Sequence, residues 1–201
     1  MRLPDGRIRK RRRSSNDADS AHALTFTTWR RQPFLASDRA CRWLAESIEH
    51  ARARHHLDLW AFVMMPDHVH LIIWPRAELN LAKLLASVKL PVARRVIAHV
   101  RQAAPQRLAV FEDKQPNGAC AHRFWQRGGG YDRDLRDAGT IHATIDYIHA
   151  NPVRRGLVAH PNDYQWSSAA FFTGVREGPL RPDVASIPSP PTHWRFWSVW
   201  S

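Results

Sequence analysis

Hydrophobic residues are arranged in three stretches of the chain with the pattern of β-strands. The first, His22–Thr28, alternates polar and apolar positions and is rich in β-branched residues. The other two, Leu57–Met65 and His68–Trp74, are separated only by Pro66 and Asp67, which favour a tight turn. We therefore expect these two stretches to form an antiparallel hairpin.

Apolar positions recur at intervals of three and four residues in three further segments, which predicts helices. These segments are Asp38–Arg54, Leu79–His99 and Ile141–Ala150. Pro91 lies inside the second of them and is expected to kink or divide that helix. Two further short strands are expected, at Leu108–Phe111 and Phe124–Gln126.

The order of these segments predicts an α+β fold. A hairpin between helices indicates a central antiparallel sheet with helices packed on it, rather than a doubly wound parallel sheet. We expect this domain to span residues 21–176. Residues 1–20 are expected to form a basic flexible arm, which either contacts phosphates or is a solubilising leader or start-codon artefact. Residues 177–201 are expected to form a Pro/Trp-rich C-terminal tail.

Composition narrows the class of protein. The 201 residues carry 30 Lys and Arg against 18 Asp and Glu, a net charge of +12, which points to a polyanionic partner. A hydrophobic content of 44% is sufficient for a folded core. The longest apolar run, Leu59–Met65, is far too short to span a membrane, and the basic start does not lead into a signal peptide. Two cysteines cannot make a disulfide scaffold, which indicates a reducing compartment. Together with the positive charge, this predicts a cytoplasmic protein that acts on nucleic acid and not at a membrane.

The triplet His68-Val69-His70 is the clearest candidate for chemistry. Side chains on a strand alternate between the two faces, so the two histidines point the same way and Val69 points the other way. Two imidazoles on one face make half of a divalent-metal site that needs one or two further oxygen ligands. With 12 histidines in the chain, such a triplet can also arise by chance.

A second candidate is the pair Tyr147 and Asn151 near the end of the last helix. Residues four apart share a helix face, so the hydroxyl and the amide could address one metal-bound phosphate. Of the other two tyrosines, Tyr131 follows three glycines and has Leu135 four residues on, and Tyr164 lies in an expected loop with Ser168 four residues on. Tyr147 is the preferred nucleophile because it alone has a candidate metal ligand with a side-chain amide oxygen, Asn151, one turn later. A tyrosine on an amphipathic helix can equally be a core residue.

Linked motifs in this sequence resemble the REP-associated tyrosine transposases, which are single-tyrosine HUH enzymes related to the small insertion-sequence transposases. The resemblance covers roughly residues 20–175, in the same order and with comparable gaps. It rests on Val63–Ile72, Phe124–Arg127, Tyr131-Asp132, Leu135–Asp137, Tyr147–Val158 and Tyr164–Ser168.

The resemblance implies an HUH-type fold of the ferredoxin-like or RRM-like kind and a role for each matched residue. By position, His68 and His70 match the pair that binds Mg²⁺ or Mn²⁺, Tyr147 matches the nucleophile, and Asn151 matches the polar residue that completes the metal site. Asp67 stands where many members have Asn, and as a turn residue it tolerates either.

By the same resemblance, the enzyme is a metal-dependent endonuclease and strand transferase that forms a 5′-phosphotyrosine on single-stranded DNA. Its substrates would be REP-type hairpins in a bacterial chromosome, which places it in the cytoplasm at the nucleoid. It could act as a monomer or as a homodimer.

Six arginines around the later motifs are expected to contact DNA phosphates, although any one of them could belong to a solvated face. They are Arg123, Arg127, Arg133, Arg136, Arg154 and Arg155. Two alternatives to the transferase stay open at this point. One is a DNA-hairpin-binding protein without catalysis, and the other is a metal-dependent hydrolase in which the histidines activate water.

Overall fold

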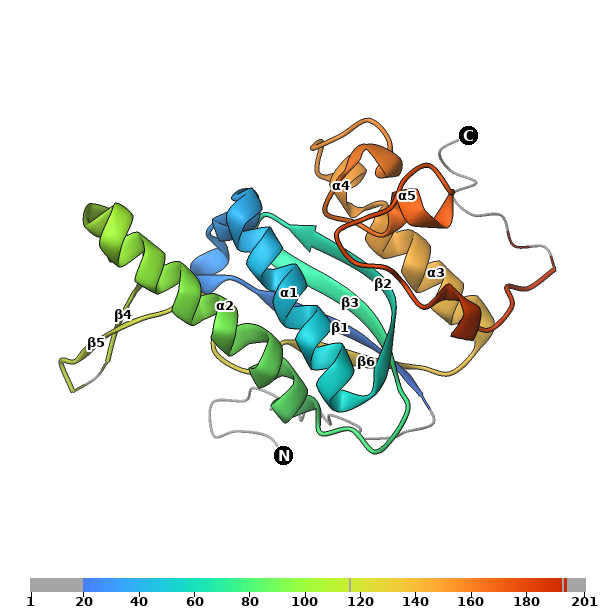
Figure 1. Ribbon diagram of the computed structural model, residues 1–201, viewed down its shortest axis with the longest axis horizontal. Coiled ribbons are helices and arrows are strands. Elements are labelled where there is room, and N and C mark those ends of the chain that lie inside the picture. The colour runs from blue at the N-terminus through green and yellow to red at the C-terminus, as the bar shows by residue number, and fades with distance from the viewer. Residues whose placement is uncertain (1–19, 116, 193, 195–201) are drawn as a thin grey trace, which may run out of the picture.

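The centre of the molecule is a four-stranded antiparallel sheet, seen here in a computed structural model that describes residues 20–115, 117–192 and 194 (Figure 1). All neighbouring strands pair antiparallel, and β2 is joined to β3 by the expected tight turn. In spatial order the strands are β2 (Leu57–Met65), β3 (His68–Pro75), β1 (Ala21–Thr27) and β6 (Tyr131–Leu135).

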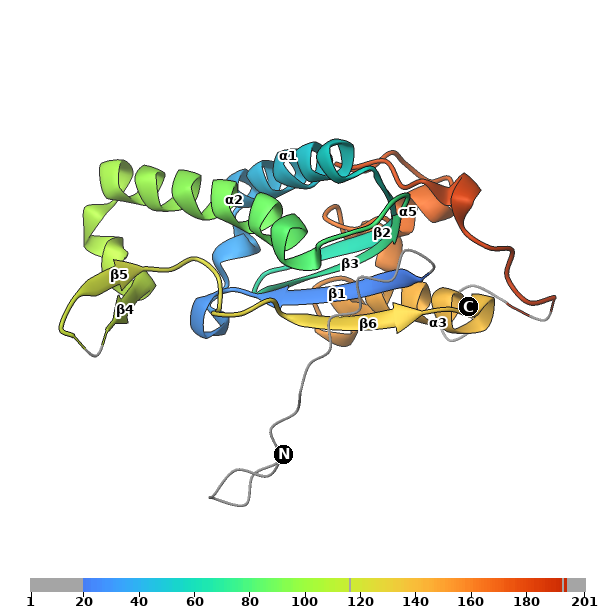
Figure 2. The same ribbon diagram turned by 90° about the horizontal axis from the view of Figure 1, so that it is seen from below.

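Helices cover both faces of this sheet (Figure 2). Helices α1 (Asp38–His55) and α2 (Leu81–Ala103) lie over one face, and α3 (Ala138–His149) lies against the other. Along the chain, α1 connects β1 to β2 and α2 lies between β3 and β6, which is the split β-α-β arrangement of ferredoxin-like domains. The predicted α+β class with a central antiparallel sheet is confirmed.

Shorter elements complete the chain. The described helices include α4 (Asn151–Arg154) and α5 (Ala169–Phe172), with 3₁₀ turns at Trp29–Arg31, Phe34–Ala36, Pro105–Phe111, Pro161–Asp163 and Val184–Ser186. A separate two-stranded hairpin projects beyond α2, made of β4 (Glu112–Lys114) and β5 (Cys120–His122).

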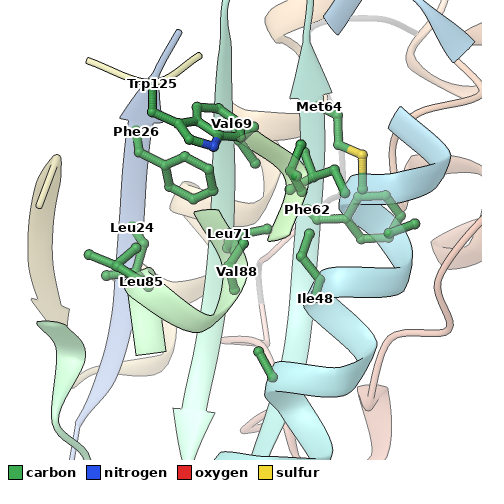
Figure 3. Close-up of a cluster of buried hydrophobic side chains, with 14 of the residues drawn as sticks. Leu24, Phe26, Ile48, Phe62, Met64, Val69, Leu71, Leu85, Val88 and Trp125 are labelled. Atoms are coloured by element: carbon green, nitrogen blue, oxygen red, sulfur yellow. The ribbon is translucent and has the colours of Figure 1, made fainter. Parts of the chain in front are cut away.

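The main hydrophobic core lies between the sheet and helices α1 and α2 (Figure 3). Alternate residues of the strands supply it, and the helices add Ile48, Leu85 and Val88 from above. Trp125 closes one end, where its ring meets Phe26 edge to face at a centroid distance of 5.1 Å. The strand residues in the cluster are Leu24, Phe26, Phe62, Met64, Val69 and Leu71.

Pro91 neither divides α2 nor leaves its broken hydrogen bond unsatisfied. A proline has no N–H for the carbonyl four residues earlier, which here belongs to Ser87. The hydroxyl of Ser47, on the neighbouring α1, donates to the carbonyls of Val88 at 2.9 Å and Ser87 at 3.3 Å. A hydroxyl from the packed partner helix thus offers the freed Ser87 carbonyl a longer, shared hydrogen bond, and α2 continues to Ala103.

Several short elements differ from the sequence-based expectation, and the β4–β5 hairpin was also not expected. Leu108–Phe111 belongs to a 3₁₀ turn that starts at Pro105, a residue well suited to the first position of a helix. The segment Phe124–Gln126 makes a single bridge, between Trp125 and Thr28, rather than a strand. Strand β6 was not expected, because Tyr-Asp-Arg-Asp-Leu has no apolar alternation and becomes a strand by pairing with β1.

The described part of the expected C-terminal tail packs along β2. Asp183 accepts a hydrogen bond from the backbone N–H of Leu59 at 2.8 Å, and Trp60 donates to the Ser186 hydroxyl at 2.9 Å. The expected basic arm, apart from residue 20, lies outside the described residues, as does the chain after residue 194. Within the described ranges, no helix has both the length and the apolar character needed to cross a membrane.

Candidate active site and metal-binding residues

The strand register aligns candidate residues across the sheet face that α3 covers. Thr25 of β1 pairs with His70 on one side and with Tyr131 on the other, and Val63 pairs with His70 from β2. His68 lies one step along the same face of β3, with its ring centroid 4.8 Å from that of His70. The two histidines therefore share a face, as their spacing predicts.

Each of the two imidazoles is held through its Nδ1 atom. His68 Nδ1 lies 2.6 Å from Asp67 Oδ1, and His70 Nδ1 lies 2.8 Å from the Thr25 hydroxyl. An ionised carboxylate only accepts hydrogen bonds, so His68 donates through Nδ1 and keeps its lone pair on Nε2. Metal-binding histidines are oriented in this way by partners on the second ring nitrogen. The donor set fits a divalent cation held by the two Nε2 atoms.

The electrostatics of the pair also suit metal binding. Burial, reinforced by the neighbouring His68, lowers the pKa of His70 to about 4, against a smaller opposing effect of Asp67. His70 is therefore neutral at physiological pH, which is the form that binds metals. Burial raises the pKa of Asp67, but the His68 hydrogen bond and nearby positive charges outweigh it and keep the pKa below its usual value.

Tyr147 projects from α3 toward the histidines. Its ring centroid is 6.2 Å from that of His70, and 49% of its surface is exposed, so it is not a core residue. The apolar residues of α3, among them Ile141, Ile145 and Ile148, are buried on the sheet side. The guanidinium of Arg154 lies 4.9 Å from the centre of the Tyr147 ring, which places positive charge beside the phenol.

Asn151 lies just beyond the helix that carries Tyr147, as the expected end of that helix at Ala150 implies. Helix α3 ends at His149, and Asn151 opens the short α4. Its side-chain amide donates to the backbone carbonyls of Tyr147 at 3.1 Å and Ile148 at 3.4 Å. The residue therefore caps the end of α3 and stabilises the turn that carries Tyr147. Its role as a third metal ligand, through the amide oxygen, stays a prediction.

A cavity of about 210 Å³ adjoins His70 and Tyr147. Thr25, His70, Tyr131, Arg133 and Tyr147 are among the residues that line it. Sequence reasoning set Tyr131 aside because of the glycines before it, yet it is 55% exposed and shares this cavity. Thr25 was not singled out from the sequence at all. The alternation of side chains along its strand, which puts Thr25 on the same face as Ala23, was the available signal.

The six predicted DNA-binding arginines separate into groups. Arg133 lines the cavity, Arg154 lies over Tyr147, and Arg155 lies 3.5 Å from Asp67. Arg136 follows β6 directly and is exposed. The remaining two, Arg123 and Arg127, bind the buried carboxylate of Asp113, a residue of strand β4.

Hydrogen bonds from Arg123 and then Arg127 lower the pKa of Asp113 to about 2. These two arginines therefore have a structural partner, whatever they contribute to DNA binding.

One other cluster has donor atoms spaced for a metal ion among the described residues. His22 Nδ1 lies 3.1 Å from Asp132 and 3.4 Å from Asp134, and the three donor atoms are within 4.8 Å of one another. His22 is two residues from Leu24 on β1, so both side chains point to the same face of the sheet. The cluster therefore lies on the α1–α2 side, away from His70. It joins β1 to the edge strand β6.

Comparison with known proteins places this chain in a family. A curated Haemophilus influenzae protein named as a REP-associated tyrosine transposase is 28% identical over 142 residues, which cover 67% of this chain and 75% of that protein. A solved structure of a REP-associated tyrosine transposase bound to a REP hairpin matches with a TM-score of 0.60, over 89% of this chain and 96% of that one. At 18% identity, the structural likeness shows the fold.

The family model described as "Transposase IS200 like" matches residues 19–151, from the strand β1 to Asn151. The matched segment contains the histidine pair, Tyr147 and every strand of the central sheet. Since the match extends over well over half of the 201 residues, the chain belongs to the IS200-like transposase family and is an enzyme of that family.

Proposed function

We propose that this protein is a metal-dependent strand transferase that cleaves single-stranded DNA beside REP-type hairpins, with Tyr147 as the nucleophile. The observation that carries the proposal is the convergence of His68, His70 and Tyr147 on one sheet face, at ring distances of 4.8 and 6.2 Å. The hairpin substrate is supported by the names of the relative and of the matched structure.

The side chains suit an in-line transfer. The Tyr147 oxygen attacks the phosphorus of a phosphodiester, forming a 5′-phosphotyrosine bond while the bond to the 3′ oxygen breaks. The phenol loses its proton and the leaving oxygen gains one, so the products are the protein–DNA adduct and a free 3′-hydroxyl. A Mg²⁺ or Mn²⁺ ion held by His68 and His70 would withdraw charge from the phosphate. Arg154, whose guanidinium lies over the Tyr147 ring, adds positive charge beside the attacking phenol.

Exposure of Tyr147 and the adjoining open cavity support a single strand as the substrate. A phosphate within a duplex would bring two strands and their paired bases to a site of about 210 Å³. An unpaired strand can instead place one base beside Tyr131 and Arg133, since bases stack on aromatic side chains and guanidinium groups.

The proposal is tested by trapping the adduct. A hairpin oligonucleotide with single-stranded flanks, labelled at one end or the other, is incubated with protein and Mg²⁺ or Mn²⁺ and separated under denaturing conditions. The 3′ label is expected in a protein-shifted band, and the 5′ label in a shorter free fragment. Tyr147→Phe should reduce the adduct by about a thousandfold or more, and His68→Ala and His70→Ala should abolish the adduct that forms with Mg²⁺ or Mn²⁺.

Tyr131→Phe is the matched control, because it removes a hydroxyl from the same cavity and should leave the adduct in place. An adduct that survives Tyr147→Phe but not Tyr131→Phe would reassign the nucleophile. Cleavage without any adduct would indicate a hydrolase. Binding without cleavage, across several hairpins and both metals, would indicate a hairpin-binding protein.

A further inference from the structure

Asp67 occupies the turn between β2 and β3 and is anchored there by the backbone. Its carbonyl accepts hydrogen bonds from the Thr28 N–H at 2.9 Å and from the Thr28 hydroxyl at 3.0 Å. These contacts fix the turn to the end of β1 without using the side chain. The carboxylate, whose side chain is 14% exposed, is therefore free to serve another purpose.

The two carboxylate oxygens of Asp67 have different partners. Oδ1 receives the His68 Nδ1–H at 2.6 Å, which directs His68 Nε2 toward the metal site. Oδ2 lies 3.4 Å from Arg31 Nη1 and 3.5 Å from Arg155 Nη2. One carboxylate thus connects a metal-binding imidazole to two guanidinium groups that come from opposite ends of the domain sequence.

Both arginines remain available to a ligand. Their side chains are 67% exposed for Arg31 and 54% for Arg155, and each meets Asp67 through one long contact. A guanidinium has five N–H donors, so most of them stay unused by Asp67. Two positive charges against one negative leave this group with a net charge of +1. An anion can be bound here without displacing Asp67.

We propose that Asp67 is a positioning residue that joins the metal site to a phosphate-binding subsite formed by Arg31 and Arg155. The ligand of the subsite is a phosphodiester of the DNA strand, next to the one that Tyr147 attacks. This inference rests on the proposed function. Guanidinium pairs bind phosphate oxygens through several parallel hydrogen bonds, and a shared carboxylate keeps both groups within reach of one phosphate.

The test measures binding alone, in Tyr147→Phe protein, so that cleavage does not interfere. Mn²⁺ affinity is measured by calorimetry, and affinity for a hairpin with a single-stranded flank by fluorescence anisotropy at several salt concentrations. Asp67→Ala should weaken Mn²⁺ binding about 10- to 100-fold. Asp67→Asn should restore most of it, because the amide oxygen can accept the same hydrogen bond from His68.

Arg31→Gln and Arg155→Gln should leave Mn²⁺ affinity unchanged and weaken DNA binding about 5- to 50-fold, with a salt slope lower by about 0.7. If both bind one phosphate, the double variant should lose less than the product of the two single losses. Arg107→Gln is the matched control, since it removes an exposed arginine from the 3₁₀ turn before β4.

The positioning role is overturned if Asp67→Ala binds Mn²⁺ as the parent does, or if Asp67→Asn binds it as poorly as Asp67→Ala. The subsite is overturned if Arg107→Gln weakens DNA binding as much as Arg31→Gln, or if the two losses simply multiply. Thr28 contacts the backbone carbonyl of Asp67 and not its carboxylate, so both Asp67 variants should fold. A protein that shows these binding effects but forms no adduct would retain this inference and lose the transferase activity.

Discussion

Alternate residues of the same strands build the two faces of the sheet, and the faces differ sharply in character. On β3, Val69 and Leu71 are buried under α1 and α2, whereas His68 and His70 point to the side of α3 and Tyr147. The first face is a mainly hydrophobic layer with aromatic contacts, and His22 with its two aspartates lies at its β6 edge. The second face has a smaller hydrophobic cluster under α3 and, next to it, the polar groups of the site, with each imidazole held by a hydrogen bond. Strand alternation thus lets one segment stabilise the fold and hold the chemistry, so substitutions on the two faces should have separable effects.

The largest change in stability is expected on the sheet face that α1 and α2 cover. Phe26→Ala removes a ring that is 1% exposed and meets Trp125 edge to face. Loss of its burial should lower the free energy of unfolding by about 3–5 kcal/mol, as measured by urea denaturation. Mn²⁺ affinity of the folded protein should stay the same. A loss below about 1 kcal/mol would mean that this face is not the main source of stability.

Thr25, next to Phe26 on the side of the sheet that α3 covers, should show the opposite result: a loss of metal affinity with little change in stability. Thr25→Val keeps the shape but removes the hydroxyl at His70 Nδ1, so Mn²⁺ affinity should fall about 10- to 100-fold, or roughly 1.4–2.7 kcal/mol. Stability should change by less than about 1 kcal/mol. Thr27→Val, at the position paired with His68, is the control. Equal effects of both substitutions on metal binding would argue against a specific role of Thr25.

A buried histidine away from the cavity should affect stability through pH. Burial lowers the pKa of His149 to about 3, so it is neutral in the folded state and takes up a proton on unfolding below about pH 6.5. Its stabilising contribution is present above that pH and is lost as the pH falls toward 3. Between pH 7 and 5 the loss should be on the order of 1–2 kcal/mol. His149→Gln should flatten this pH dependence in urea titrations, and an unchanged slope would contradict the assignment.

The smallest effect is expected for a single exposed cation at the cavity. Arg133→Gln should weaken binding of single-stranded DNA about 2- to 5-fold and lower the salt slope by about 0.7. The free energy of unfolding should change by less than about 0.5 kcal/mol. Anisotropy titrations at two salt concentrations measure the affinity for DNA and its salt slope. A salt slope equal to that of the parent would show that Arg133 contacts no phosphate.

Much of the fold was predictable because its signals are local. The three apolar stretches, the hairpin turn and the three helices follow from periodicity within each segment. Strand β6 was not predictable in this way, since its pairing with β1 joins segments more than 100 residues apart. The same holds for Asp67, which local reasoning treats as a turn residue and which contacts Arg31 and Arg155.

The sequence by itself determined the alternation that puts His68 and His70 on one face, the helix that carries Tyr147, and the motifs of a transposase family. Only the tertiary structure decided which arginines reach that face, and that the Ser47 hydroxyl of the neighbouring helix lies within hydrogen-bonding distance of the carbonyl freed by Pro91. Side-chain direction within a strand or helix is set by the backbone of that element. Contacts between elements depend on how the whole core packs, which no local pattern encodes.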